Sequence, residues 1–187
     1  MNTKSCPVRA LLACLLLVFL SACGKEEEYH ETTLRLLKKG QIENEIVENF
    51  GQNYYNADEL RTMLTESAED YAKLTGKKDG AVFKSLSVEN NVAKAVFRFK
   101  SAADYAAFNQ TEFFVGTLNE ARAQSYDLGV SLISPLDGGI SELASLPADT
   151  RLIIVKEPVM VVPDGDIAYV SANVEYVDDR HARVSSD

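Results

Sequence analysis

The side chains that most often carry catalysis or bind metals are scarce in this sequence. Only two histidines, His30 and His181, and three cysteines occur in the whole chain. A zinc centre needs several histidine or cysteine ligands, and a Ser-His-Asp triad needs an imidazole that is held in place. His30 falls in a charged stretch and His181 near the tail, so we expect neither to lie in a rigid segment. The sequence predicts no zinc site and no histidine-based catalytic centre.

Other catalytic and cofactor patterns are also missing from the sequence. It contains no Gly-Xaa-Ser-Xaa-Gly elbow and no Gly-Lys-Ser or Gly-Lys-Thr phosphate loop. The Asp-Gly pairs at 137–139 and 164–166 lack the spacing of a calcium loop and are typical of turns. The 28 acidic residues offer many pairs that would suit glycoside hydrolysis, so no single pair is evidence for it. We therefore expect a protein without enzymatic activity, bound metal or cofactor.

Two adjacent tyrosines, Tyr54 and Tyr55, are the most interesting surface candidates. They precede a predicted helix and follow a predicted strand, at a corner where a pair of rings can stack on a sugar or a peptide. Cores also use the large apolar area of aromatic side chains. We therefore expect one tyrosine to pack inward and the other to cover the start of the helix, with ligand binding by Tyr54 and Tyr55 as the alternative.

The segment 1–22 has the pattern of an export signal. Lys4 and Arg9 come first, an apolar run follows from Ala10 to Leu20, and the small residues Ser21 and Ala22 end the segment. A positive start, an apolar run and a small-residue exit are typical of a cleaved secretory signal. A membrane-spanning helix needs about 20 apolar residues, and the run from Ala10 to Leu20 is much shorter than that. We predict a signal peptide over 1–22.

The end of this segment, Leu20-Ser21-Ala22-Cys23, resembles the lipobox of bacterial lipoproteins. The resemblance implies that the Cys23 thiol receives a diacylglyceryl group and that cleavage follows just before Cys23. It also implies that the protein is bound to the cell membrane on its extracytoplasmic face. In Gram-negative lipoproteins, an aspartate directly after the lipidated cysteine resembles an inner-membrane retention signal. Here that position is Gly24. In a Gram-negative host, the outer membrane is therefore a possible location.

Processing at Cys23 would change both the charge and the thiol content of the chain. Cys6 and Cys14 would leave with the signal and Cys23 would carry lipid, so no disulfide could form. The whole sequence has a formal charge of −9, and loss of Lys4 and Arg9 would make the mature chain more acidic still. An acidic chain repels phosphate backbones. We expect the membrane and an envelope protein or small molecule as partners, and no nucleic acid.

The mature segment reads as a charged tether over 23–31 and one domain over 32–187. Asn56 and Glu59 form a capping box. The apolar residues after them recur at helical spacing until Gly76. This pattern predicts a helix over 57–75 with Met63, Tyr71 and Leu74 on its apolar face. The patterns predict two hairpins, one of 32–37 with 42–50 and one of 81–88 with 92–100. They also predict two shorter helices after N-caps, over 102–109 and 117–126. The remaining segments with strand character, most of them near the end of the chain, are 112–116, 130–133, 151–156, 159–162, 167–170 and 173–177.

These elements predict an α+β fold: a single compact domain of antiparallel β-hairpins packed with two or three helices. Pro163-Asp164-Gly165-Asp166 is predicted to turn the chain between the strands at 159–162 and 167–170. We expect the segment 127–149 to be mostly loop and the segment 182–187 to fray. A split into two domains near 135–149 is the alternative.

A second resemblance rests on several short segments of the mature chain: Asn49-Phe50, Tyr54-Tyr55, Glu59-Leu60, 104–109 and 167–174. In these segments the chain resembles small uncharacterised lipoproteins of anaerobic Gram-positive bacteria. This resemblance supports an envelope location and a non-enzymatic role, and it carries over no site residues.

We therefore interpret the sequence as that of a membrane-anchored lipoprotein acting as a non-catalytic binding or accessory protein of the cell envelope. Two alternatives remain at this point. The first is a carboxylate-based hydrolase that acts on envelope glycans. The second is a solute-binding lipoprotein of a transporter, although the mature chain is short for the two lobes that such proteins usually have.

Overall fold

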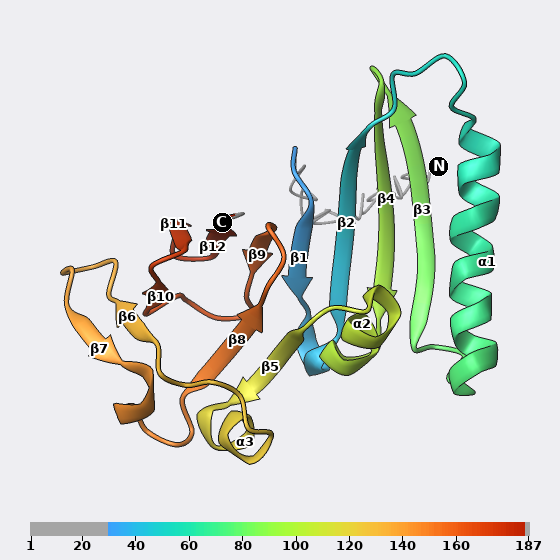
Figure 1. Cartoon of the computed structure of the whole chain (residues 1–187). Coiled ribbons are helices and arrows are strands. Elements are labelled where there is room, and N and C mark those ends of the chain that lie inside the picture. The colour runs from blue at the N-terminus through green and yellow to red at the C-terminus, as the bar shows by residue number, and fades with distance from the viewer. Residues whose placement is uncertain (1–29, 186–187) are drawn as a thin grey trace, which may run out of the picture.

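One seven-stranded mixed sheet unites strands from both halves of the chain (Figure 1). The computed structural model describes residues 30–185. The strand order is β11-β12-β9-β1-β2-β4-β3. The strands of this sheet are β1 (Thr33–Leu36), β2 (Ile42–Asn49), β3 (Ala81–Glu89), β4 (Val92–Phe99), β9 (Met160–Val162), β11 (Val174–Asp178) and β12 (His181–Val184).

Two hairpins form the N-terminal part of the sheet, as the sequence predicts. β1 and β2 are joined through a short 3-10 helix, η1 (Lys38–Gly40), and β3 and β4 through Asn90 and Asn91. Both asparagines have positive φ, 50° and 63°. A two-residue hairpin loop with left-handed backbone at both positions matches the twist of the strands, and asparagine tolerates that conformation better than most residues.

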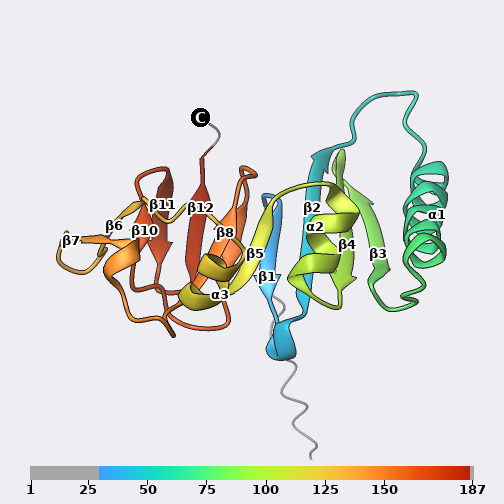
Figure 2. The ribbon, with the colours of Figure 1, turned by 60° about the horizontal axis from the view of Figure 1, so that its bottom comes forward.

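The core lies between this sheet and α2 (Ala102–Asn109), which covers one face (Figure 2). Along β4 the burial alternates strictly, and Phe97 and Phe99 are almost fully buried. The Phe99 ring lies 5.1 Å from that of Tyr105 and the Phe97 ring 5.3 Å from that of Phe108. The alternating face of β4 and the inward rings of Tyr105 and Phe108 thus pack against each other in the core.

The longest helix of the described residues, α1 (Ala57–Thr75), has the predicted ends. The Asn56 Oδ1 accepts hydrogen bonds from the N–H groups of Asp58 and Glu59, and Gly76 ends the helix at φ 70°. The helix runs beside the edge strand β3 (Figure 1). Arg61 Nη2 donates to the carbonyl oxygen of Leu86 in that strand at 2.9 Å. The helix thereby covers an edge whose free backbone groups would otherwise invite pairing with another chain.

The expectation that the whole apolar stripe of α1 faces the core is wrong at two positions. Met63 is 55% exposed and Leu74 is 86% exposed, whereas Tyr71 is buried. A helix at the edge of a sheet contacts fewer neighbours than one lying across its face. The side of α1 that packs on buried residues carries Leu60, Leu64, Ala68 and Tyr71.

The C-terminal part adds two small sheets. β5 and β8 pair with each other, α3 follows β5, and β10, β6 and β7 form a three-stranded sheet in that order. These elements span β5 (Phe113–Thr117), α3 (Leu118–Ala123), β6 (Ser131–Ile133), β7 (Ile140–Glu142), the 3-10 helix η2 (Leu143–Ser145), β8 (Arg151–Val155) and β10 (Val170–Ser171).

Several expectations for this part are wrong. The segment 163–166 does not close a hairpin, because β9 belongs to the large sheet and β10 pairs with β6. The segment 182–184 does not fray but lies in β12, between β11 and β9. The predicted helix over 117–126 ends at Ala123, and the predicted loop over 127–149 contains β7 and η2. The pairings of β10 with β6 and of β12 with β9 join segments that are not neighbours in the sequence.

The predicted α+β class is confirmed, and residues 30–185 form a single domain. The sheets are not purely antiparallel, since β1 pairs with β9 in parallel, Thr33 opposite Met160. The ends of the described chain are also connected by side chains. Glu31, which was expected to belong to the tether, accepts hydrogen bonds from Arg183 at 2.7 and 2.9 Å. The start of the described chain is therefore fixed to the last strand of the fold.

Candidate functional site

The structure places Tyr54 and Tyr55 on the surface, in the loop between β2 and α1. Tyr54 is 73% exposed and Tyr55 is 43% exposed. The expectation that one of them packs inward is wrong. The ring that does pack inward is that of Phe50, slightly earlier in the same loop, which contacts the small apolar cluster of Leu86, Ala93 and Ala95.

Phe50, Tyr54 and Tyr55 form one continuous aromatic surface, which we call the aromatic corner. The rings of Phe50 and Tyr55 lie 4.9 Å apart with planes 31° from parallel. The rings of Tyr54 and Tyr55 also lie 4.9 Å apart, but nearly perpendicular at 77°. Both are favourable arrangements of aromatic quadrupoles. The perpendicular pair presents ring surface to solvent in two directions.

Backbone hydrogen bonds fix the loop that carries the corner. The Phe50 N–H donates to the carbonyl oxygen of Asn91 at 2.7 Å, which connects the loop to the β3–β4 turn. The Gly51 N–H donates to Asn49 Oδ1 at 2.9 Å, and the Tyr55 N–H donates to the carbonyl oxygen of Gln52 at 3.1 Å. The cap at Asn56 then starts α1. The rings are thus preorganised between two regular elements.

The loop passes close to the turn at Gly51. A Cβ on Gly51 would lie 3.2 Å from the Cβ of Asn91 and 3.3 Å from Asn49 Oδ1. Such contacts are tighter than ordinary packing, so the side chain of Asn91 or Asn49 would have to shift slightly to accommodate a larger residue. The short approach at Gly51 keeps the aromatic corner and the exposed asparagines of the β3–β4 turn at the same end of the sheet (Figure 1).

The surroundings of the corner are polar and partly acidic. Exposed amides come from both segments and exposed carboxylates flank them. The amides belong to Gln52, Asn53, Asn90 and Asn91, and the carboxylates to Glu48, Asp58, Glu59 and Glu89. Amides both donate and accept hydrogen bonds. The site can therefore pair with hydroxyl groups, whereas its carboxylates repel anions.

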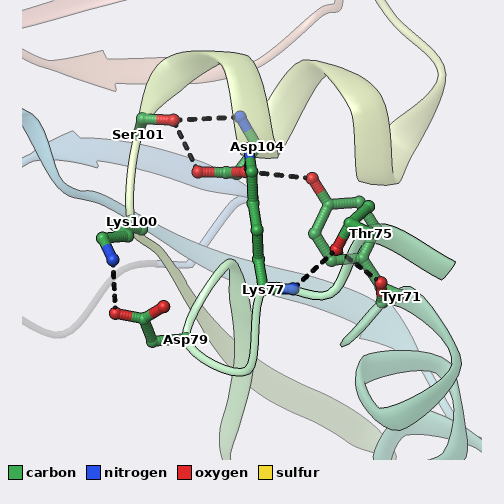
Figure 3. Close-up of polar contacts among 7 residues, drawn as sticks. All are labelled: Tyr71, Thr75, Lys77, Asp79, Lys100, Ser101 and Asp104. Carbon is green, nitrogen blue, oxygen red and sulfur yellow. Dashed lines mark hydrogen bonds and ion pairs between the residues drawn. The ribbon is translucent and has the colours of Figure 1, made fainter. Parts of the chain in front are cut away.

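A second polar cluster is centred on the buried carboxylate of Asp104 in α2 (Figure 3). No pattern in the sequence predicted its contacts with the distant segment. Asp104 is 2% exposed, and three donors reach its carboxylate. Lys77 Nζ lies 2.7 Å and the Tyr71 hydroxyl 3.1 Å from Oδ1, while the Ser101 hydroxyl donates to Oδ2 at 2.6 Å. The cluster connects α2 with α1 and with the segment just after it. The sequence showed only the local cap, Ser101 with Asp104, because the other two partners come from a distant segment.

The ionisation of this cluster follows from its contacts. Burial raises the pKa of Asp104, but the hydrogen bonds from Lys77, Ser101 and Tyr71 outweigh burial, so that its pKa is lowered overall. Burial, and then the hydrogen bond to Asp104, raises the pKa of Tyr71. A carboxylate stabilised in this way is a poor general acid, since a glycosidase acid needs a raised pKa. Asp104 therefore gives the hydrolase alternative no support, and its contacts join α2 to α1 and to the segment after it.

The histidines lie in different surroundings. His30 is exposed at the start of the described residues. His181 lies in β12, so the expectation that it falls outside rigid structure is wrong, and its Nδ1 is 2.8 Å from Asp178 Oδ1. An aspartate orients an imidazole in this way in catalytic triads, but the pair by itself supplies no nucleophile.

Metal ligands and membrane-spanning helices are the remaining features that could indicate a function. Within 30–185 no three histidine, cysteine, aspartate or glutamate side chains gather closely enough to hold a metal ion. No helix in the same range has the length and apolar character needed to cross a membrane. Leu20, Ser21, Ala22 and Cys23, which resemble a lipobox, lie outside the described residues.

Comparison with known proteins gives no relative. No family model matches the sequence, and no curated protein or solved structure matches it significantly.

Proposed function

We propose that this chain is a lipid-anchored binding protein of a bacterial envelope, held on the extracytoplasmic face of the membrane through Cys23. The segment Lys4 to Cys23 supports the anchor, since a positive start, a short apolar run and a lipobox-like end follow one another at suitable distances. Each buried CH₂ contributes about 0.8 kcal/mol and one acyl chain binds only marginally, so two or more chains on Cys23 would give stable attachment.

The observation that carries the binding role is the aromatic corner. Hydration of the apolar surface of an exposed aromatic ring is unfavourable. Tyrosine is enriched where proteins contact ligands, because it offers a large contact area with few rotatable bonds. Tyr54 and Tyr55 are exposed, although the small apolar cluster beside them accommodates the ring of Phe50. We assign them to ligand contact without catalysis.

The single-domain fold argues against a two-lobed solute-binding protein. The large sheet contains strands from both ends of the range 30–185, and the main core lies against it. A ligand would bind on the outer surface rather than between lobes. The acidic charge of the chain also argues against nucleic acid as the ligand.

The anchor is tested by replacing Cys23 in a bacterial host fed labelled palmitate. We expect the unchanged chain to be labelled, membrane-bound and shortened to begin at Cys23. Cys23→Ser should lose the label and either leave the membrane or keep its full precursor mass. Cys14→Ser, which changes a cysteine inside the predicted signal, is the matched control and should behave like the unchanged chain. If Cys23→Ser is still labelled and membrane-bound at the mature mass, the anchor is refuted.

A further inference from the structure

We propose that the aromatic corner binds neutral saccharides. The inference rests on the proposed binding role and names the ligand class for it. It follows from three properties of this surface: exposed ring area, amides beside it and carboxylates around it.

The rings fit the apolar side of a sugar. A pyranose ring has a face of C–H groups, which carry slight positive charge and are attracted to the negative face of an aromatic ring. Tyr54 and Tyr55 are nearly perpendicular, so one ring can lie under a sugar while the other stands at its edge. Phe50 lies against the ring of Tyr55 and packs on the Leu86 cluster, which keeps Tyr55 from turning inward.

The amides fit the polar edge of a sugar. Each hydroxyl of a saccharide can both donate and accept a hydrogen bond, and an amide side chain offers both functions without charge. Gln52 and Asn53 are exposed within the loop, and Asn90 and Asn91 are exposed on the turn beside it. The Phe50–Asn91 backbone bond keeps these two segments together. Aromatic surface and hydroxyl partners therefore lie at one end of the sheet.

The flanking charges decide between classes of ligand. Glu48, Asp58, Glu59 and Glu89 repel anionic sugars and phosphorylated ligands. A protein partner would bury about 800 Å² on each side, which would also cover these carboxylates and require their desolvation or pairing. A saccharide of a few units can contact the rings and amides and leave the carboxylates in water. The observations therefore favour a neutral saccharide over an anionic glycan or a protein.

The binding should be weak at a single site, because the corner is an open surface. A Kd of about 1 mM is the expected order. Many copies anchored in one membrane would raise the apparent affinity for a polymer with repeated units. A fixed loop limits the entropy lost on binding.

The test uses the full chain, purified in a detergent without a sugar headgroup, and saturation-transfer NMR. The probes are the trisaccharides of N-acetylglucosamine, glucose and galactose at about ten times the expected Kd, a galacturonic acid trisaccharide as the anionic comparison, and a proline-rich decapeptide as the peptide comparison. We expect transfer to at least one neutral trisaccharide and at least tenfold less to the anionic one. Tyr54→Ala and Tyr55→Ala should each weaken that binding at least tenfold, whereas Tyr54→Phe should keep it within threefold.

Tyr169→Ala is the matched control, since Tyr169 is also exposed, at 38%, but precedes β10 in the other half of the fold. It should leave binding unchanged. Tyr54 lies outside the core, so Tyr54→Ala should keep the unfolding midpoint of the unchanged chain, which shows that a loss of binding is local. Absence of transfer to all three neutral trisaccharides, or equal transfer in Tyr54→Ala, refutes the proposal. Transfer to the peptide alone refutes the saccharide but leaves the binding role standing, and the Cys23 experiment judges the anchor separately.

Discussion

Replacing Asp104 by asparagine removes the negative charge from a buried carboxylate that connects α2 to α1. Asp104 Oδ1 accepts from Lys77 and Tyr71, and Oδ2 accepts from Ser101. Asparagine has nearly the same size, so no cavity forms. Its Oδ1 can still accept two of these bonds, while its amide nitrogen faces a serine hydroxyl that can turn to accept. The change therefore isolates the contribution of charge.

The expected loss in the free energy of unfolding follows from the hydrogen bonds that Asp104 accepts. A hydrogen bond to a charged group contributes about 1.5–3 kcal/mol and one between neutral groups about 0.5–1.5 kcal/mol, a difference of roughly 1 kcal/mol per bond. The bonds from Tyr71 and Ser101 are well shielded, because the Asp104 side chain is 3% exposed. The Lys77 side chain is 54% exposed, so solvent screens its ion pair and its share is smaller. Asp104→Asn should lower the free energy of unfolding by about 2 kcal/mol at neutral pH.

The pH dependence gives a second, independent signature. The pKa of Asp104 is lowered in the folded protein, whereas in the unfolded chain it should lie near about 3.9. The carboxylate therefore adds stability above about pH 5, and this contribution is lost as the pH falls through the folded pKa. Between about pH 5 and pH 2 the unchanged chain should lose more stability than Asp104→Asn. The difference in the free energy of unfolding between the unchanged chain and Asp104→Asn should therefore shrink as the pH falls.

Urea unfolding of the chain from Gly24 onward, followed by far-UV circular dichroism at several pH values, measures both effects. Asp79→Asn is the matched control, because Asp79 forms an exposed ion pair with Lys100 at 2.7 Å a short distance away (Figure 3). Exposed pairs contribute less than about 1 kcal/mol. The structural role of the Asp104 cluster is refuted if Asp104→Asn lowers the free energy of unfolding no more than Asp79→Asn does. It is also refuted if Asp104→Asn and the unchanged chain lose the same stability between neutral and acid pH.

Two further predictions concern other contacts. Asn56→Ala removes the acceptor of the Asp58 and Glu59 N–H groups and should lower the unfolding free energy by about 1 kcal/mol in urea, whereas an unchanged midpoint would show that the cap is dispensable. The hydrogen bond to Asp179 raises the pKa of Tyr176 to about 12. Asp179→Asn should lower the pKa of that phenol toward its ordinary value of about 10. In an alkaline titration, tyrosinate absorbance should then appear at a lower pH than in the unchanged chain. An identical titration curve would contradict this contact.

The aromatic pair at the corner shows how local and tertiary information differ. The sequence located Tyr54 and Tyr55 between a strand and a helix, and it offered ligand binding as an alternative to packing. It could not decide which aromatic enters the core, because that depends on the distance between the loop and the β3–β4 turn. The close approach of Gly51 to Asn91 brings Phe50 over the Leu86 cluster and leaves both tyrosines outside.

The buried cluster around Asp104 shows the same limit. Ser101 followed three positions later by an acid predicted the start of α2 correctly. The same carboxylate then binds Tyr71 and Lys77, which come from the end of α1 and the turn after it. Neither partner is signalled by any local pattern. Tyr71 appeared in the sequence only as one more apolar residue on a helical stripe.

The elements that the sequence determined are those whose signals are local. The ends of α1, both N-terminal hairpins and the start of α2 depend on caps, turn residues and alternation within a few positions, and all of these are read directly from neighbouring residues. The tertiary structure alone decided that β9 pairs in parallel with β1, that the segment 182–184 forms an inner strand, and that Met63 and Leu74 remain in solvent. Strand pairing and burial depend on which distant segments meet, and short apolar strands carry too little information to specify their partners.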